Sequence, residues 1–155
     1  MPTKLKTTAG VRAGDQLNNV GLKATPQRLK VLKILGSHER RHLSAEEIYQ
    51  RITEQEGGVG LATVYRVLGQ LTDVGIVDRH IFDADSGKAV YELHQGAHHD
   101  HLICIECGRV EEFADDTINE RSRGVAEARG FALAQHELAL YGYCSACRTA
   151  AKKTQ

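Results

Sequence analysis

The sequence predicts an α+β protein made of two domains, residues 1–94 and residues 95–155. Up to about residue 74, apolar residues recur at the spacing of helices. Two β-like runs follow directly and are joined by a short polar turn. Beyond residue 94, short strand patterns surround a single helical stretch. We therefore expect a mainly helical front domain that ends in a hairpin, and a small α/β back domain.

Start and stop signals divide the front domain into helices. A short helix is expected over residues 11–20. Thr25 can cap a second helix whose first residue is Pro26, a position where the missing N–H of proline costs nothing, and Gly36 ends this helix. Ser44 opens a capping box that starts a third helix.

A fourth helix is expected from Leu61 to about Val74, and Gly75 is well placed as the residue after its end. The β-like runs over residues 76–82 and 88–93 flank a polar turn, which is typical of a hairpin. Helices followed by a hairpin form the winged variant of the helix-turn-helix. The front domain is thus expected to bind DNA.

The back domain is expected to follow a β-β-α-β order. Residues 101–105 and 109–113 have the pattern of strands around a tight turn, residues 115–129 that of a helix, and residues 131–141 that of a last strand. A module of this kind exposes a sheet edge or a helix face. Such a surface favours dimerisation.

Composition limits the classes of protein that the chain can belong to. Of the 155 residues, 41% are hydrophobic and 26% are charged, with a net charge of zero, which argues against a protein that coats nucleic acid without specificity. Residues 1–81 carry 12 Lys and Arg against 8 Asp and Glu, and residues 82–155 carry 8 against 12, so the halves suit different partners. Without a long apolar run or a recognisable secretory signal, a cytoplasmic protein is expected.

Two C-x2-C pairs point to a metal. Zn²⁺ in structural sites takes four protein ligands in a tetrahedron, and each pair supplies two thiolates from one tight turn. Disulfides are rare in a reducing compartment, and neither pair of cysteines has the βαβ surroundings of a thioredoxin-like redox motif. We expect a structural zinc ion on Cys104, Cys107, Cys144 and Cys147.

The run HHDH at residues 98–101 can seed two further metal sites. In a strand, successive side chains point to opposite faces, so its odd-numbered and even-numbered residues separate. Imidazole and carboxylate ligands suit Fe²⁺, Mn²⁺, Zn²⁺ or Co²⁺. Glu92 and Glu112 are candidates to join the odd-numbered pair, and His136 to join the even-numbered pair. The alternative is that this run is only the polar, solvated end of a strand and binds no metal.

Five residues of the front domain are candidates for DNA contacts. Arg66 can form a bidentate pair with guanine, and the ring of Tyr65 can pack on a thymine methyl group. Thr63 and Arg28 suit phosphate contacts, which position the protein without reading sequence. Lys23 suits an A·T-rich minor groove. The alternatives are a core role for Tyr65 and simple solvation of Lys23.

Taken together, these motifs resemble the ferric uptake regulator family of bacterial metal-dependent repressors, with the iron-responsive branch the most similar. The matching segments are GLKAT (21–25), HLSAEEIY (42–49), GLATVYRVL (60–68), HHDHLICIECG (98–108) and LYGYCSAC (140–147). The resemblance implies a homodimer that binds palindromic A·T-rich operator DNA when loaded with metal and represses metal-uptake genes. It implies no enzyme activity, no small-molecule substrate and no membrane partner.

Matched motif by motif, the resemblance also implies three metal sites: the structural zinc on the four cysteines, a regulatory site and an additional site. The regulatory site takes Fe²⁺, with Mn²⁺, Co²⁺ or Zn²⁺ as substitutes, and maps to His42, Glu92, His99, His101 and Glu112. The additional site maps to His98, Asp100 and His136. Its usual fourth ligand is a glutamate, for which this sequence has Asn119, followed by Glu120, which is turned by about 100° around the helix.

Other functions remain open at this point. A zinc, manganese or peroxide sensor of the same family has the same ligand types, because affinity order and cellular availability decide the metal. A metallohydrolase could use the His and Asp groups to activate water, but no motif supplies an evident base. A metal-storage or trafficking protein is a third class, which sequence-selective DNA binding would exclude.

Overall fold

The computed structural model describes residues 9–37, 42–83 and 85–151, and the chain divides into two compact units, Met1–Gln95 and Gly96–Gln155. Ala84, in the middle of the expected hairpin turn, lies outside the described residues. Among the residues that are described, no helix is long and apolar enough to cross a membrane.

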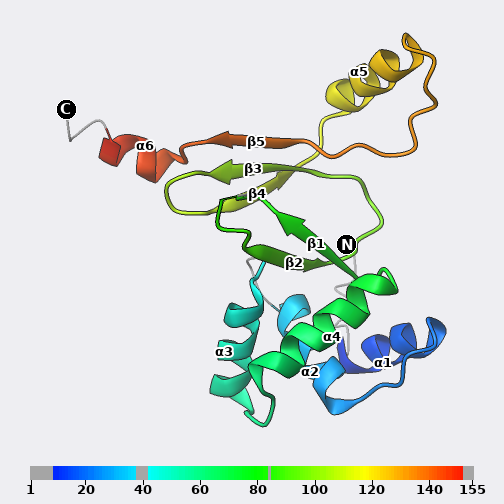
Figure 1. The fold of residues 1–155 in the computed structure, drawn as a ribbon, viewed down its shortest axis with the longest axis vertical. Coiled ribbons are helices and arrows are strands. Elements are labelled where there is room, and N and C mark those ends of the chain that lie inside the picture. The colour runs from blue at the N-terminus through cyan, green and yellow to red at the C-terminus, as the bar shows by residue number, and fades with distance from the viewer. Residues whose placement is uncertain (1–8, 38–41, 84, 152–155) are drawn as a thin grey trace, which may run out of the picture. The chain divides into compact units, whose positions relative to one another are not determined.

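The first unit is mainly helical, as predicted (Figure 1). Its helices are α1 (Ala9–Asn19), α2 (Pro26–Ser37), α3 (Ala45–Gln55) and α4 (Leu61–Asp73). The expected capping box of α3 is present: the Glu47 N–H donates to Ser44 Oγ at 3.2 Å, and the Ser44 N–H donates to the Glu47 carboxylate at 2.8 Å. Gly75 follows α4 with a φ of 74°, a conformation that favours glycine at a helix end.

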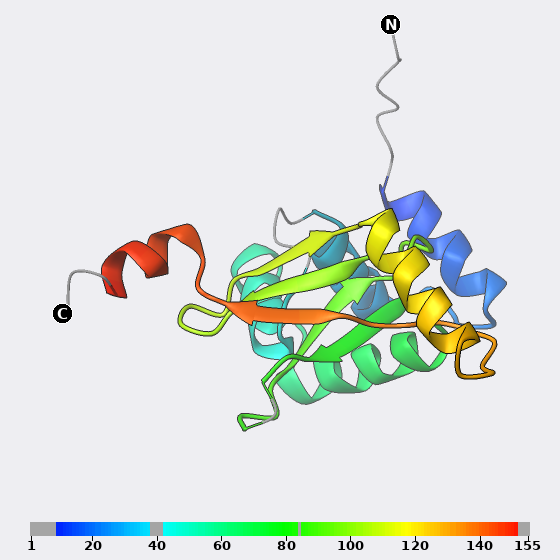
Figure 2. The same ribbon diagram turned by 90° about the horizontal axis from the view of Figure 1, so that it is seen from above.

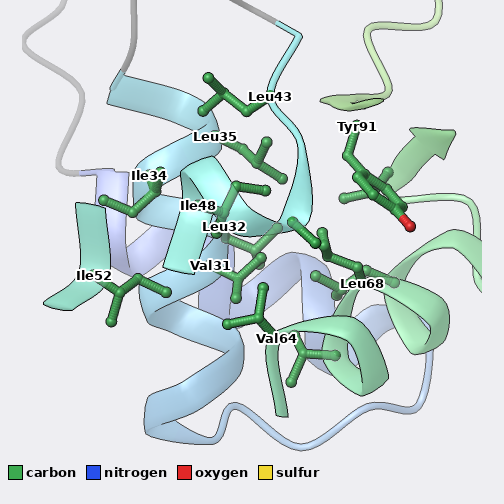
Figure 3. Close-up of a cluster of buried hydrophobic side chains, with 14 of the residues drawn as sticks. Val31, Leu32, Ile34, Leu35, Leu43, Ile48, Ile52, Val64, Leu68 and Tyr91 are labelled. Atoms are coloured by element: carbon green, nitrogen blue, oxygen red, sulfur yellow. The ribbon is translucent and has the colours of Figure 1, made fainter. Parts of the chain in front are cut away.

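The core of the first unit lies where α2, α3 and α4 meet (Figure 3). Val31 of α2, Ile48 of α3 and Val64 and Leu68 of α4 are fully buried there. Burial of one such side chain stabilises a fold by about 1.5–3 kcal/mol. Because these residues fix one face of α4 in the core, the opposite face of α4 is left for solvent or a partner.

A hairpin follows α4, as predicted. Strands β1 (Val77–Ile81) and β2 (Ala89–Leu93) pair antiparallel, with Asp78 opposite Glu92. An isolated bridge between Leu43 and Tyr91 ties β2 to the segment before α3, through hydrogen bonds of 3.0 and 2.8 Å. The bridge fixes the residues on either side of Leu43 and Tyr91 close to one another.

The second unit is built around β3 (Asp100–Cys104), which pairs antiparallel with β4 (Val110–Phe113) and parallel with β5 (Ala139–Gly142) (Figure 2). A parallel pair needs a crossover connection, which α5 (Asp116–Glu127) supplies here. Asp115 caps α5 by accepting hydrogen bonds from the N–H groups of Thr117 and Ile118 at 2.8 and 3.2 Å. The last element is the short helix α6 (Ser145–Ala151).

The prediction of a last strand over residues 131–141 is wrong in its extent. Residues 131–138 form no strand, and β5 covers only Ala139–Gly142. The physical reason is the length of its partner: β3 pairs with β5 only from His101 to Cys104. The short helix α6 was not expected from the sequence, although it begins directly after Cys144.

Candidate metal centres and nucleic-acid interface

The four cysteines lie together in the second unit. Cys104 ends β3, and the turn to Cys107 is closed by a hydrogen bond of 2.9 Å from the Gly108 N–H to the Cys104 carbonyl. Cys144 and Cys147 stand at the start of α6, and all four Sγ atoms lie within 4.8 Å of one another as free thiols. The Cys107 and Cys144 sulfurs are 3.8 Å apart. A tetrahedron with Zn–S bonds of about 2.3 Å has edges of about 3.8 Å.

Hydrogen bonds give these thiols unequal acidity. Backbone N–H groups of Cys144 and Cys107 point at the Cys104 sulfur and lower the pKa of Cys104 to about 6. Hydrogen bonds with the Cys144 and Cys107 thiols raise the pKa of Cys147 to about 12. One thiolate thus forms readily, and its charge opposes ionisation of Cys147. Since a divalent cation removes that opposition, the cluster fits a structural zinc ion.

A second ligand group lies at the start of β3. His98 Nε2 is 3.2 Å and His136 Nε2 is 3.8 Å from Asp100 Oδ1, and the two imidazole centroids are 4.1 Å apart. Asp100 Oδ1 also accepts a hydrogen bond of 3.1 Å from the Leu138 N–H. Buried Asp100 Oδ2 and His136 Nε2 have no hydrogen-bond partner among the described residues. Buried polar atoms without partners cost free energy, and a bound cation would remove that cost.

The position where the family has a glutamate lies in the first part of α5. Asn119 Oδ1 is buried and has no hydrogen-bond partner among the described residues. Glu120, the candidate from the sequence, is exposed and is not part of the group formed by His98, Asp100 and His136. The two neighbours face different directions because one residue rotates a helical side chain by about 100°.

The first unit holds two of the residues expected in the regulatory site. His42 precedes Leu43 and Glu92 follows Tyr91, so the Leu43–Tyr91 bridge brings them together, with His42 Nε2 3.3 Å from Glu92 Oε1. The same carboxylate oxygen is 2.8 Å from Nε2 of His80 on β1. His80 was not a candidate from the sequence, because its contact with Glu92 depends on the hairpin register.

The other three expected regulatory residues belong to the second unit. The His99 and His101 rings lie edge to face with centroids 5.0 Å apart, which confirms that they share a side of the chain. Glu112 is the direct cross-strand partner of His101 in the β3–β4 register. The second unit therefore gathers two imidazoles with a carboxylate opposite them, a ligand set that suits Fe²⁺ or Mn²⁺.

The exposed face of α4 carries the residues expected to read bases. Tyr65 is 46% exposed and Arg66 is also exposed, so Tyr65 is not a core residue. The Tyr65 hydroxyl donates a hydrogen bond to the Glu46 carboxylate of α3. This bond lowers the pKa of the Glu46 carboxyl and raises the pKa of the Tyr65 hydroxyl. Glu46 was not singled out in the sequence.

Arg28 and Lys23 are connected at the surface. The Arg28 guanidinium donates to Gln70 Oε1 of α4 at 2.9 Å and to the Lys23 carbonyl at 2.8 Å. Arg28 thereby ties α4 to the segment before α2 and holds the backbone of exposed Lys23. Thr63 is half-buried at the start of α4. The five DNA candidates thus belong to α4, α2 and the segment before α2.

Comparison with known proteins gives consistent matches along most of the chain. Residues 19–141 match the model of the ferric uptake regulator family. The ferric uptake regulation protein of Cupriavidus metallidurans is 53% identical over 129 residues, which cover 83% of this chain and 89% of that protein. The ferric uptake regulator structure from Vibrio cholerae is 47% identical, with a TM-score of 0.78, and covers 84% of this chain and 98% of that one. The structure of the Helicobacter pylori regulator is described as revealing three functional metal-binding sites. It is 30% identical to this chain, with a TM-score of 0.78, and the match covers 95% of this chain and 97% of that one.

Proposed function

Because the chain belongs to the ferric uptake regulator family, we propose that it represses metal-uptake genes by binding palindromic, A·T-rich operators as a metal-loaded homodimer. As a member, it is an iron-responsive transcriptional repressor that binds operator DNA, and it is not an enzyme. The observation that carries the proposal is the grouping of cysteine, histidine and carboxylate ligands in a protein that also presents Tyr65 and Arg66 on an exposed helix face.

The four cysteines are assigned to a permanent structural Zn²⁺. A closed four-thiolate site leaves no open position and binds too tightly to follow changes in metal supply. A zinc ion held by these residues would act as a cross-link between the end of β3 and the start of α6. The backbone N–H of Cys144 supports the ligand set by donating to Cys104 Sγ at 3.4 Å.

The regulatory ion is assigned to His42, Glu92, His99, His101 and Glu112. Fe²⁺ is the proposed ion, with Mn²⁺, Co²⁺ or Zn²⁺ as substitutes, because the ligands are nitrogen and oxygen atoms. One ion that takes ligands from both units would favour one arrangement of the units over others. It regulates DNA binding only if it binds the DNA-competent arrangement better, and DNA must then tighten metal binding equally. A coupling of about 1–3 kcal/mol changes DNA affinity about 5–150-fold.

The additional site is assigned to His98, Asp100 and His136, with the amide oxygen of Asn119 in place of the carboxylate that the family uses. The support is the burial of Asn119 Oδ1, which has no hydrogen-bond partner in the part of the chain that the structure describes, and the exposure of Glu120. Because the amide of Asn119 is neutral, the loaded site has one negative charge fewer than a site with a glutamate at this position. We therefore expect a divalent cation to bind this site less tightly than it would bind a site with two carboxylates.

The operator is read by α4, which serves as the recognition helix. Arg66 and Tyr65 are proposed to contact base edges, and Thr63 and Arg28 to contact phosphates. Lys23 is proposed to enter the adjacent minor groove, and Arg28 supports it by holding its carbonyl.

The second unit is the proposed dimerisation unit. Every residue of α5 is at least partly exposed, although the helix supplies the crossover of the sheet. Large apolar side chains are also exposed along this unit, and a soluble protein seldom leaves such a surface uncovered. They include Leu102, Ile105, Phe131, Leu140, Tyr141 and Tyr143.

The test is operator binding after selective removal of the exchangeable ion. Protein that retains its cysteine-bound zinc is titrated with Fe²⁺ without oxygen, and separately with Mn²⁺, Co²⁺ and Zn²⁺, in a gel-shift assay. Stimulation by Fe²⁺ at the lowest free concentration supports the proposal, and a preference for another ion assigns the chain to a different sensor type. Equal operator affinity with and without the exchangeable ion would refute the proposed regulation.

A further inference from the structure

One face of the β1–β2 hairpin carries two opposed carboxylates. Asp78 and Glu92 are direct cross-strand partners. Like charges in this position destabilise a sheet, because their side chains share a face at short range. Each carboxylate contacts a histidine diagonally across the hairpin: Glu92 Oε1 lies 2.8 Å from His80 Nε2, and Asp78 Oδ2 lies 2.8 Å from His94 Nδ1.

The two acid–histidine pairs differ in their exposure to solvent. The His80 and Glu92 side chains are 14% and 1% exposed, whereas those of His94 and Asp78 are 54% and 36% exposed. A hydrogen bond to a charged group is stronger where water is excluded, and an exposed pair contributes little. The His80–Glu92 contact is therefore the one that fixes a carboxylate in place.

The His80 ring is itself held by an aromatic neighbour. It stacks on Phe82 with ring centroids 5.3 Å apart and an interplanar angle of 5°. The same Phe82 ring meets the His42 ring edge to face at 5.9 Å. A stacked imidazole loses little further freedom when it donates a hydrogen bond. His80 is thus a rigid donor beside the two ligands that the first unit offers.

We propose that His80 is a positioning residue for the regulatory metal: its Nε2–H holds Glu92 Oε1, so that the carboxylate is already oriented when the ion arrives. The inference rests on the proposed regulatory site, in which Glu92 is a ligand and His80 is not. Groups that orient a ligand by hydrogen bonding typically change metal affinity by about 10–100-fold when removed.

The experiment compares two substitutions of His80 in the full chain with its zinc retained. His80→Leu removes the donor, whereas His80→Gln keeps an N–H at similar reach. His94→Leu is the matched control, because it removes the exposed acid–histidine pair of the same hairpin. The readouts are the Co²⁺ dissociation constant and the visible spectrum of the Co²⁺-saturated protein. We expect His80→Leu to weaken Co²⁺ binding about 10–100-fold, His80→Gln to retain most of the affinity, and His94→Leu to change nothing.

The saturated Co²⁺ spectrum separates positioning from ligation. A spectrum that stays the same in every variant supports the proposal, because the ligand set is unchanged. An altered spectrum in both His80 variants would make His80 a ligand and overturn it. Unchanged Co²⁺ affinity in His80→Leu would also overturn it. Glu92→Ala serves as the parallel variant: if Glu92→Ala too leaves the affinity unchanged, the proposed regulatory site itself is wrong. Thermal melting checks folding. If His80→Leu does not fold, His80→Phe carries the test, because it removes the donor but can keep the stack on Phe82.

Discussion

The hydroxyl of Tyr65 on α4 donates a hydrogen bond to the carboxylate of Glu46 on α3. The two residues come from separate helices of the helix-turn-helix, and Tyr65 remains 46% exposed. The hydrogen bond to Glu46, rather than packing in the core, therefore orients the Tyr65 ring. It also places a carboxylate beside a residue that we expect to touch DNA, which disfavours close approach of a phosphate at that point.

Replacing Tyr65 by Phe tests this bond. The Tyr65 hydroxyl is the largest cause of the lowered Glu46 pKa, so the pKa should rise towards its ordinary value of 4.5 in the variant. A carboxyl whose pKa is lowered by folding stabilises the protein above its unfolded pKa, and this contribution is lost as pH falls through the folded pKa. The stability difference between Tyr65→Phe and the original protein should thus be present above about pH 5 and vanish in acid. Urea unfolding across that pH range measures it, and a pH-independent difference would contradict the assignment.

Arg66→Ala should lower sequence-specific binding more than general DNA binding. Loss of a bidentate contact with guanine costs about 1–3 kcal/mol, or about 5–150-fold in operator affinity. Lys33→Ala is the matched control, since Lys33 is exposed on α2 and pairs with Glu56 at 2.6 Å. Fluorescence anisotropy with operator and scrambled duplexes gives both affinities. Equal losses on the two duplexes would assign Arg66 to the phosphate backbone instead.

The elements of the first unit could be predicted because their signals are local. Ser44 and Glu47 stand three residues apart and cap α3, and Gly75 ends α4 by its own conformation. The segment over residues 131–138 shows the limit of local reasoning. Its alternation is that of a strand, but a strand also needs a partner, and the β3 register pairs only with residues 139–142.

The same distinction applies to the candidate sites. The separation of His99 and His101 from His98 and Asp100 follows from the period of two in a strand, and the ring contacts agree with it. His80 was missed because its contact requires the register that sets Asp78 opposite Glu92. No pattern in one strand gives the register between two.

Cys104→Ala should remove the structural zinc and destabilise the second unit. The substitution deletes one of the four ligands and the sulfur that accepts the Cys144 N–H hydrogen bond. A structural zinc contributes folding free energy directly, so the melting temperature should fall and dimers should dissociate. Calorimetry, sedimentation and zinc content measure the three effects. If all three match those of the original protein, the zinc assignment is wrong.

His99→Ala should separate regulation from folding. His99 is a proposed regulatory ligand and takes no part in the cysteine cluster, so zinc content and melting temperature should stay the same. The stimulation of operator binding by Fe²⁺ or Mn²⁺ should fall, within the coupling of about 5–150-fold that one ion can supply. His94→Ala, which affects an exposed ion pair with Asp78, is the control. Full stimulation in His99→Ala would remove His99 from the mechanism.

Asn119→Glu should strengthen the additional metal site. The substitution supplies the carboxylate that the family has there, and a second negative charge near a divalent ion should raise its affinity at least about tenfold, or about 1.4 kcal/mol. Without metal, the new carboxylate should repel that of buried Asp100 and lower the melting temperature at neutral pH. Excess Zn²⁺ or Mn²⁺ should then restore stability by more than it does in the original protein. Glu120→Gln, at an exposed neighbour, should change neither quantity. Asn119→Glu protein with the original metal affinity and melting temperature would show that Asn119 does not face His98, Asp100 and His136.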